Sequence, residues 1–189
     1  MALRFGFGLI ALLGLPVSAL ACQSVHNLIG SNCGFTAGLT GWENLTSGTC
    51  QPNNTIGVTD ANNITCSSFA GAINHVVRFR YCIKAAAGVA PNRLYAYGAW
   101  GQKVSGGTVS CTVQAADWSQ DNCQFNINAE TTPLDPGGAY VQSTPATYTT
   151  GANAVSVHVQ VECTSGSAFQ IRVDDATFLD DRIFGNGFQ

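Results

Sequence analysis

A strict alternation of apolar and polar residues near the end of the chain constrains the fold most strongly. Valines occupy every second position from 155 to 161. The positions between them are polar: Ser156, His158, Gln160 and Glu162. A period of two places successive side chains on opposite faces of an extended strand. The same pattern returns over 77–83 and 169–173, so we predict three strands that each have one buried and one solvated face.

Further short strands are expected near 63–69, 93–100, 107–115 and 121–128, because Gly, Pro, Asn or Asp bounds each of these segments. Apart from the N-terminal leader, no segment has the apolar periodicity of an amphipathic helix, and the chain has no internal repeat. Many short strands with turns between them, in one domain, predict an all-β chain folded as an antiparallel β-sandwich.

The first 21 residues have the three parts of a secretory signal peptide. Arg4 supplies the positive charge, 5–15 the apolar run, and Ala19-Leu20-Ala21 a small-x-small cleavage site before Cys22. The apolar run is too short for a membrane-spanning helix. Acylation of Cys22 is the alternative, but it would leave an odd number of cysteines. We expect 1–21 to be cleaved.

The predicted mature chain is a single domain, 22–181, followed by a short tail, 182–189. The length suits one domain with a full hydrophobic core. The tail, Arg-Ile-Phe-Gly-Asn-Gly-Phe-Gln, resembles the I-F-x-N-G-F-E tail of many exported proteins of certain Gram-negative bacteria. We therefore expect a secreted or extracellular protein, with the periplasm and the outer cell surface as alternatives.

The charge pattern excludes some classes of partner. The chain has a net charge of −3, only 10% of its residues are charged, and Lys and Arg do not cluster. Nucleic acids and anionic lipid surfaces are recognised through basic patches, so neither is an expected partner. No segment after the leader is apolar enough to predict a membrane span.

Cysteine content predicts a fold held by disulfides. The predicted mature part contains all eight cysteines: Cys22, Cys33, Cys50, Cys66, Cys82, Cys111, Cys123 and Cys163. An even number in an exported chain favours disulfides, and no C-x-x-C motif suggests a metal site. A turn at 116–119 would set Cys111 opposite Cys123 in a hairpin, so we predict that pair. The first four cysteines are expected to pair among themselves, which leaves Cys82 and Cys163.

Motifs of catalysis are absent from the sequence. There is no G-x-S-x-G elbow, H-E-x-x-H motif, P-loop or dinucleotide fingerprint. The carboxylate pairs Asp174-Asp175 and Asp180-Asp181 are adjacent in sequence, so on a strand the two members point to opposite faces. We therefore expect a protein that is not an enzyme. A small hydrolase with an unrecognised site is the remaining catalytic alternative.

Both ends of the predicted domain carry motifs of a known family. The opening reads Asn27-Leu28-Ile29, then Gly34-Phe35, then Gly-Leu-Thr-Gly-Trp over 38–42, and the closing strand over 169–178 contains Asp174-Asp175. These motifs resemble the first and last strands of galactose-binding-like jelly rolls, which include many carbohydrate-binding modules. The resemblance implies that the two strands lie side by side and that the protein binds a ligand without chemistry.

The same resemblance implies a structural calcium ion. In many relatives a Glu after the motif Phe and a late Asp bind calcium together with main-chain oxygens. This chain has Thr36 at the position of the Glu. Asp174 or Asp175 could still supply an oxygen ligand. The alternative is that one of the two faces solvent and the other caps a loop.

Two surfaces are candidates for sugar binding, in which aromatic rings cover the apolar side of a sugar and polar groups bind its hydroxyls. The first is a predicted hairpin tip with Trp118, Asp117, Gln120 and Asn122, to which Tyr95 and Tyr97 are added as a further aromatic pair. The second would form if the three clear strands were neighbours. It comprises Arg78, Arg80, His158, Gln160 and Arg172, with Glu162 and Asp174 at its margin.

The resemblance and these candidates predict a secreted, non-catalytic protein that binds a glycan or another cell-surface polymer. The main alternative is a structural or adhesive surface protein that acts through protein contacts. The polar strand faces also have a simpler interpretation, a solvated sheet surface balanced by cross-strand charge pairs.

Overall fold

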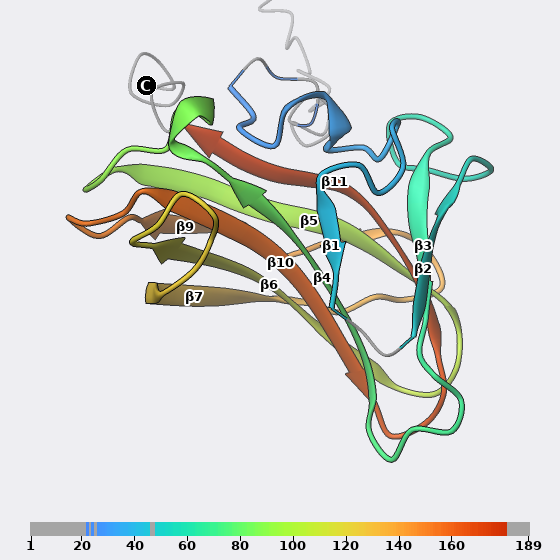
Figure 1. The fold of residues 1–189 in the computed structure, drawn as a ribbon. Coiled ribbons are helices and arrows are strands. Elements are labelled where there is room, and N and C mark those ends of the chain that lie inside the picture. Colours follow the sequence, from blue (N-terminus) through green and yellow to red (C-terminus); the bar gives the residue numbers. More distant parts are fainter. Residues whose placement is uncertain (1–21, 23, 25, 46–47, 181–189) are drawn as a thin grey trace, which may run out of the picture.

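Two antiparallel sheets form the protein (Figure 1), as seen in a computed structural model that describes residues 22, 24, 26–45 and 48–180. The five-stranded sheet has the order β1 (Trp42–Asn44), β4 (His75–Ile83), β10 (Ser156–Ser165), β6 (Val109–Trp118) and β7 (Asn126–Leu134). The six-stranded sheet has the order β2 (Thr49–Asn53), β3 (Asn63–Ser67), β11 (Gln170–Asp180), β5 (Leu94–Ser105) and β8 (Val141–Gln142), and β9 (Ala146–Thr149) also pairs with β5. The predicted all-β sandwich is confirmed.

Helical structure within the described ranges is limited to two short 3-10 turns, η2 (Gly30–Asn32) and η3 (Ala85–Ala87). No helix in this part of the chain has the length and apolar character needed to cross a membrane. The predicted signal peptide, 1–21, and the predicted tail, 182–189, lie outside the described residues.

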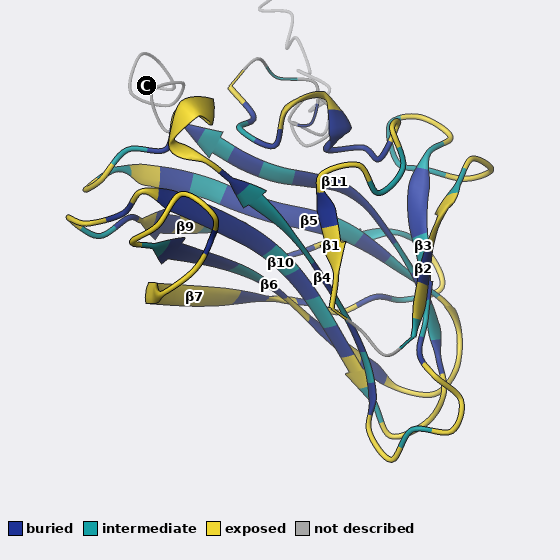
Figure 2. Ribbon diagram, viewed as in Figure 1, coloured by how far each residue is buried: buried dark blue, intermediate teal, exposed yellow. Residues whose placement is uncertain are grey.

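The alternating segments form the strands that they predict. In β10 the inward Val157, Val159 and Val161 are fully buried, and the same alternation of burial runs along β4 and β11 (Figure 2). The two inner faces meet in one hydrophobic core. Tyr95 stacks on Phe178 there, with ring centroids 4.5 Å apart. Apolar burial at the inward positions of β4, β5, β6, β10 and β11 thus holds the sheets together.

The opening and closing segments lie side by side, as the family resemblance implies. Asn27 forms an antiparallel bridge with Leu179 in β11. Its side-chain oxygen accepts a hydrogen bond from the Phe178 amide at 3.1 Å, and the Leu28 amide donates to the Phe178 carbonyl at 2.9 Å. Trp42, which ends the opening motif, is buried with its ring 5.5 Å from that of Phe79.

Four disulfides join all eight cysteines: Cys22–Cys33, Cys50–Cys66, Cys82–Cys123 and Cys111–Cys163. The first four cysteines pair among themselves as expected. The predicted Cys111–Cys123 pair is wrong, because the segment predicted as a strand over 121–128 is mostly a loop. Strand β7 begins only at Asn126, and Cys111 lies opposite Leu134 there. On the other side of β6, Cys111 faces Cys163 in β10.

Candidate functional site

The outward side of the five-stranded sheet carries a continuous polar surface, here called the polar sheet face. It includes these outward residues of β4, β6 and β10: Arg78, Arg80, Gln114, Trp118, His158, Gln160 and Glu162. Strand pairing sets them in rows, with Gln160 opposite both Arg80 and Gln114. Four residues of the second predicted surface, Arg78, Arg80, His158 and Gln160, are therefore neighbours.

Arg172 does not belong to this surface, which corrects the predicted patch. It lies in β11 of the other sheet, where its Nη1 donates a hydrogen bond to Gln102 Oε1 at 3.0 Å. Asp174 lies in β11 as well. The alternation in β11 is the same as that in β10, so the sequence pattern alone did not separate the two sheets.

Trp118 joins the polar sheet face. It was predicted at a hairpin tip, but β6 continues to Trp118 and the loop occupies 119–125. The indole Nε1 donates to His158 Nδ1 at 3.0 Å, and the two rings lie 5.2 Å apart between centroids. The Arg80 guanidinium carbon lies 5.9 Å from the centroid of the Trp118 ring. The two surfaces predicted separately are thus parts of one site.

The buried His158 imidazole accepts the hydrogen bond of the Trp118 indole. His158 is 3% exposed, and burial lowers the pKa of its imidazole to about 4, with a smaller contribution from Arg80. The ring is therefore neutral at neutral pH. Because Nδ1 accepts the Trp118 hydrogen bond, Nε2 carries the proton and donates to Gln114 Oε1 at 2.9 Å. This chain of hydrogen bonds fixes the orientation of Trp118.

The charges of the polar sheet face are balanced in pairs. Arg78 Nε lies 2.7 Å from Glu162 Oε2, and Arg80 Nε lies 2.7 Å from Glu43 Oε2 on β1. Gln160 also donates to Glu162 Oε2, at 3.3 Å. These are the cross-strand pairs expected of a solvated sheet surface. They also give the face many fixed donors and acceptors without a net charge.

The loop 119–125 borders the polar sheet face at the Trp118 end (Figure 1, yellow). The Cys82–Cys123 disulfide ties it to β4 across β10. Ser156 is fully buried beneath the loop. Its hydroxyl holds the loop in place, because it accepts a hydrogen bond from the Cys123 amide and donates one to the Gln120 carbonyl. The side chains of Gln120 and Asn122 in this loop are exposed.

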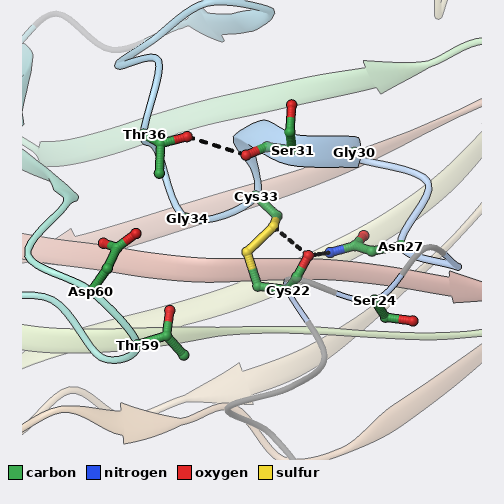
Figure 3. A pocket seen from close by; sticks show the side chains of 10 residues that line it. All are labelled: Cys22, Ser24, Asn27, Gly30, Ser31, Cys33, Gly34, Thr36, Thr59 and Asp60. Atoms are coloured by element: carbon green, nitrogen blue, oxygen red, sulfur yellow. Dashed lines mark hydrogen bonds between the residues drawn. A yellow bond between two sulfur atoms is a disulfide. The ribbon is translucent and has the colours of Figure 1, made fainter.

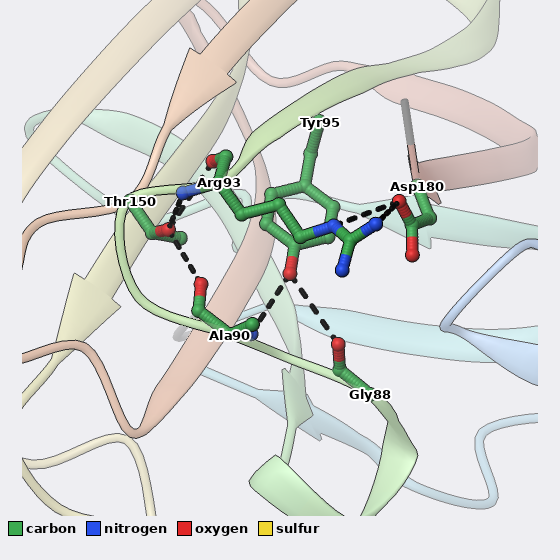
Figure 4. Close-up of polar contacts among 6 residues, drawn as sticks. All are labelled: Gly88, Ala90, Arg93, Tyr95, Thr150 and Asp180. Atoms are coloured by element: carbon green, nitrogen blue, oxygen red, sulfur yellow. Dashed lines mark hydrogen bonds and ion pairs between the residues drawn. The ribbon is translucent and has the colours of Figure 1, made fainter. Parts of the chain in front are cut away.

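Three other predicted site residues lie in the interior. Asp117 precedes Trp118 and so points inward. It is fully buried, and its Oδ2 accepts a hydrogen bond from the Gly151 amide. Tyr95 and Tyr97 are 0% and 4% exposed. The Tyr95 hydroxyl accepts from the Ala90 amide and donates to the Gly88 carbonyl (Figure 4). None of the three can contact a ligand on the polar sheet face.

Asp174 and Asp175 form a second polar site. It lies where β11 of the six-stranded sheet is covered by the N-terminal segment that contains Gly34. The two aspartates are 0% and 1% exposed. Asp175 has a φ of +43°, and the pairing of β11 with β5 shifts register at this point. This bulge brings both carboxylates toward Gly34, where an added Cβ would meet Asp175 Oδ1 at 3.2 Å and Asp174 Oδ1 at 3.9 Å. The prediction that they point to opposite faces is therefore wrong, and neither faces solvent.

The hydrogen bonds of the aspartate pair are incomplete. Asp174 Oδ2 accepts from the Val58 amide at 2.6 Å and Asp175 Oδ1 from the Thr59 hydroxyl at 2.9 Å, but Asp175 Oδ2 has no partner. Burial, with a smaller contribution from the Asp175 and Asp60 carboxylates, raises the pKa of Asp174 to about 7. Burial, with a smaller contribution from Asp60, raises the pKa of Asp175 to about 6. A cation would relieve both the burial and the repulsion.

A cavity of about 390 Å³ lies beneath the N-terminal segment (Figure 3). Its wall includes Thr59, which donates to Asp175, and Gly34, together with Ser31, Thr36 and Asp60. The Thr36 hydroxyl donates to the Ser31 carbonyl at 3.2 Å. Over the described ranges, no three His, Cys, Asp or Glu side chains converge as a metal site. Hydroxyl and main-chain oxygens would have to complete the ligands of any hard cation held by the two carboxylates.

Comparisons with known proteins identify the fold but no sequence family. No family model matches the chain, and no curated protein is similar to it in sequence. Among solved structures, the enzymatically active domain of the bacteriophage CBA120 tailspike protein 4 superposes with a TM-score of 0.64 at 14% identity. That match covers 83% of this chain but only 22% of the tailspike chain.

Smaller structures match over their whole length. A family 16 carbohydrate-binding module has a TM-score of 0.60 at 16% identity, and the match covers 82% of this chain and 100% of the module. The module TmCBM61, solved with β-1,4-galactotriose, has a TM-score of 0.54 at 10% identity, covering 82% and 98%. The chain therefore has the jelly-roll β-sandwich fold of these carbohydrate-binding modules.

Proposed function

We propose that this chain binds carbohydrate, without catalysing a reaction on it, through the polar sheet face. The observation that carries the proposal is the fixed position of Trp118, a half-buried indole hydrogen-bonded to His158 and beside Arg80. An aromatic ring buries the apolar CH side of a pyranose. Because the indole is held before a ligand arrives, little conformational entropy is lost on binding.

The neighbours of Trp118 supply the polar part of sugar recognition. Gln114 and Gln160 are amides that both donate and accept, and Arg80 adds a charged donor. All three lie on the same face and in adjacent strands. The family 16 module and TmCBM61, which share the fold, support a glycan as the ligand class. The four disulfides support secretion, because disulfides persist in oxidising compartments.

A glycan array tests this proposal. The mature protein, 22–189, is compared with an Arg80→Ala/Gln160→Ala double variant and with Arg172→Ala, which changes an arginine on the other sheet. We expect binding to one class of glycan, a weaker signal from the double variant, and an unchanged signal from Arg172→Ala. Failure of the folded, fully oxidised protein to bind any glycan would overturn the proposal.

The second candidate function, adhesion through protein contacts, has one observation in its favour. The loop between β3 and β4 exposes two large apolar side chains, Ile73 at 97% and Phe69 at 58%. Exposed apolar side chains mark a protein contact site when they join into a contiguous patch of several hundred Å². If no glycan binds, this loop is the surface with which to search for protein partners.

We further propose that the aspartate pair binds calcium. The positive charge of the ion would offset the burial and the mutual repulsion of the two carboxylates. A folded-state pKa above the ordinary value means that the pair favours folding at acidic pH, and this contribution is lost as the pH rises through about 6 to 7. Calcium needs the ionised carboxylates. It should therefore stabilise the protein more at pH 8 than at pH 5.

Thermal unfolding measures the calcium effect. At a calcium concentration of about 100 times the Kd, binding contributes about 2.7 kcal/mol, which corresponds to a rise in Tm of about 5–10 °C for a domain of this size. We expect most of this rise at pH 8, its reversal by a chelator, and its loss in Asp175→Asn. An equal Tm with calcium and with chelator at pH 8 would argue against the site.

A further inference from the structure

A second hollow lies on the outward side of the five-stranded sheet, at the end opposite Trp118. It has a volume of about 570 Å³ and is here called the distal hollow. Its lining comes from the start of β4, the start of β6 and the end of β10: Asn74, His75, Val76, Thr108, Ser110 and Thr164–Gly166. Thr164 lies opposite Val76 on one side and Ser110 on the other. The hollow thus belongs to the same three strands as the polar sheet face.

The lining of the distal hollow is chemically suited to sugar hydroxyls. Thr108, Ser110, Thr164 and Ser165 carry hydroxyls that can donate and accept, and Asn74 adds an amide. The side chains of Ser110 and Thr164 are exposed on the strand surface. They are therefore available to a ligand lying on the sheet.

Polar side chains connect the two ends without interruption. Along β10, the outward positions between Trp118 and the hollow are His158, Gln160 and Glu162. Eight positions of β6 separate Trp118 from Ser110, a span of about 27 Å at about 3.4 Å per strand residue. This distance is several sugar rings long, far more than one monosaccharide could bridge.

Charge narrows the class of ligand. The arginines of the surface between the two ends are both paired with glutamates, at 2.7 Å, and His158 is neutral. A surface whose charges are balanced does not attract a polyanion. An uncharged glycan carries no charge of its own, so its binding does not depend on a charged surface.

We propose that the polar sheet face binds an uncharged linear glycan several sugar units long, lying along β10 from Trp118 to the distal hollow. This inference rests on the proposed carbohydrate binding and adds the length and charge class of the ligand. Trp118 holds one ring by stacking, and the hydroxyls of the distal hollow bind the units at the far end. Short oligosaccharides reach only one of the two anchors.

Calorimetric titration with neutral β-1,4-linked gluco-, xylo-, manno- and galacto-oligosaccharides of two to six units tests the inference. The Ser110→Ile/Thr164→Ile variant removes two hydroxyls and fills the hollow at exposed strand positions that tolerate β-branched residues. Thr49→Ile, at an exposed position of β2 in the other sheet, is the matched control.

We expect the wild type to bind the hexasaccharide of one series at least about tenfold more tightly than its disaccharide. The hollow variant should lose that gain and still bind the disaccharide normally, whereas Thr49→Ile should match the wild type throughout. Equal affinity for all lengths, or a hollow variant that binds the hexasaccharide like the wild type, would overturn this inference and leave carbohydrate binding intact. No binding to any series or to the glycan array would overturn both.

Discussion

Removing the Cys111–Cys163 disulfide should lower the free energy of unfolding by about 4 kcal/mol on the loop-entropy model. The bridge joins residues 52 apart in sequence and lies in the core, where Cys111 is 3% and Cys163 0% exposed. A Cys111→Ala/Cys163→Ala variant keeps the site apolar. Its Tm should fall by about 8–16 °C for a domain of this size, measured by circular dichroism under oxidising conditions.

The Cys50–Cys66 disulfide offers a matched control. It also joins neighbouring antiparallel strands, but its cysteines are only 16 residues apart. The same model gives about 3 kcal/mol for this shorter loop. We therefore expect Cys50→Ala/Cys66→Ala to unfold at a higher temperature than the Cys111→Ala/Cys163→Ala variant. The reverse order would contradict the dependence of disulfide stabilisation on loop length that underlies both predictions.

Trp118→Ala should weaken glycan binding by about 30-fold or more, since the loss of a central aromatic anchor costs about 2 kcal/mol or more. The substitution removes the stacking platform and leaves His158 Nδ1 without its donor. Trp118→Phe keeps an aromatic ring but loses the hydrogen bond to His158. Its affinity for the glycan should therefore lie between that of the wild type and that of Trp118→Ala. The measurement is calorimetric titration with the glycan that the array identifies.

Trp100→Ala is the control for this experiment. Trp100 is also half-buried, but it lies in β5 of the six-stranded sheet. Its replacement should leave the affinity unchanged. If Trp118→Ala, shown to be folded by its thermal transition, bound the glycan like the wild type, the site would lie elsewhere on the molecule.

Part of the candidate site follows from sequence pattern. Alternation placed Arg78, Arg80, His158 and Gln160 outward, because the two faces of a strand are set by backbone geometry alone. Trp118 was chosen for a different reason, its place at a predicted hairpin tip among polar residues, and the structure places it at the end of a strand instead. The partners that fix the indole were not predicted, since Trp118 and His158 are 40 residues apart and meet only through the pairing of β6 with β10.

Other parts of the site depended on details that no local pattern contains. Arg172 alternates like Arg80, but its strand belongs to the other sheet. Strand β6 ends at Trp118, three residues later than the predicted turn at 116–119 suggested, which moved Trp118 from a loop to a strand and Asp117 into the interior. At Asp175, a left-handed backbone turns two carboxylates the same way. Each outcome came from packing and register, not from residue type.

The sequence by itself determined that this chain is a β-protein with an even set of cysteines and strands of period two, and that it carries none of the common catalytic motifs. Only the tertiary structure decided which strands are neighbours, which cysteines pair and which polar faces join into one surface. The physical reason is the range of the interactions. Side-chain alternation is fixed within a few residues, whereas the pairing of strands with equally apolar inner faces is selected by contacts between distant segments of the folded chain.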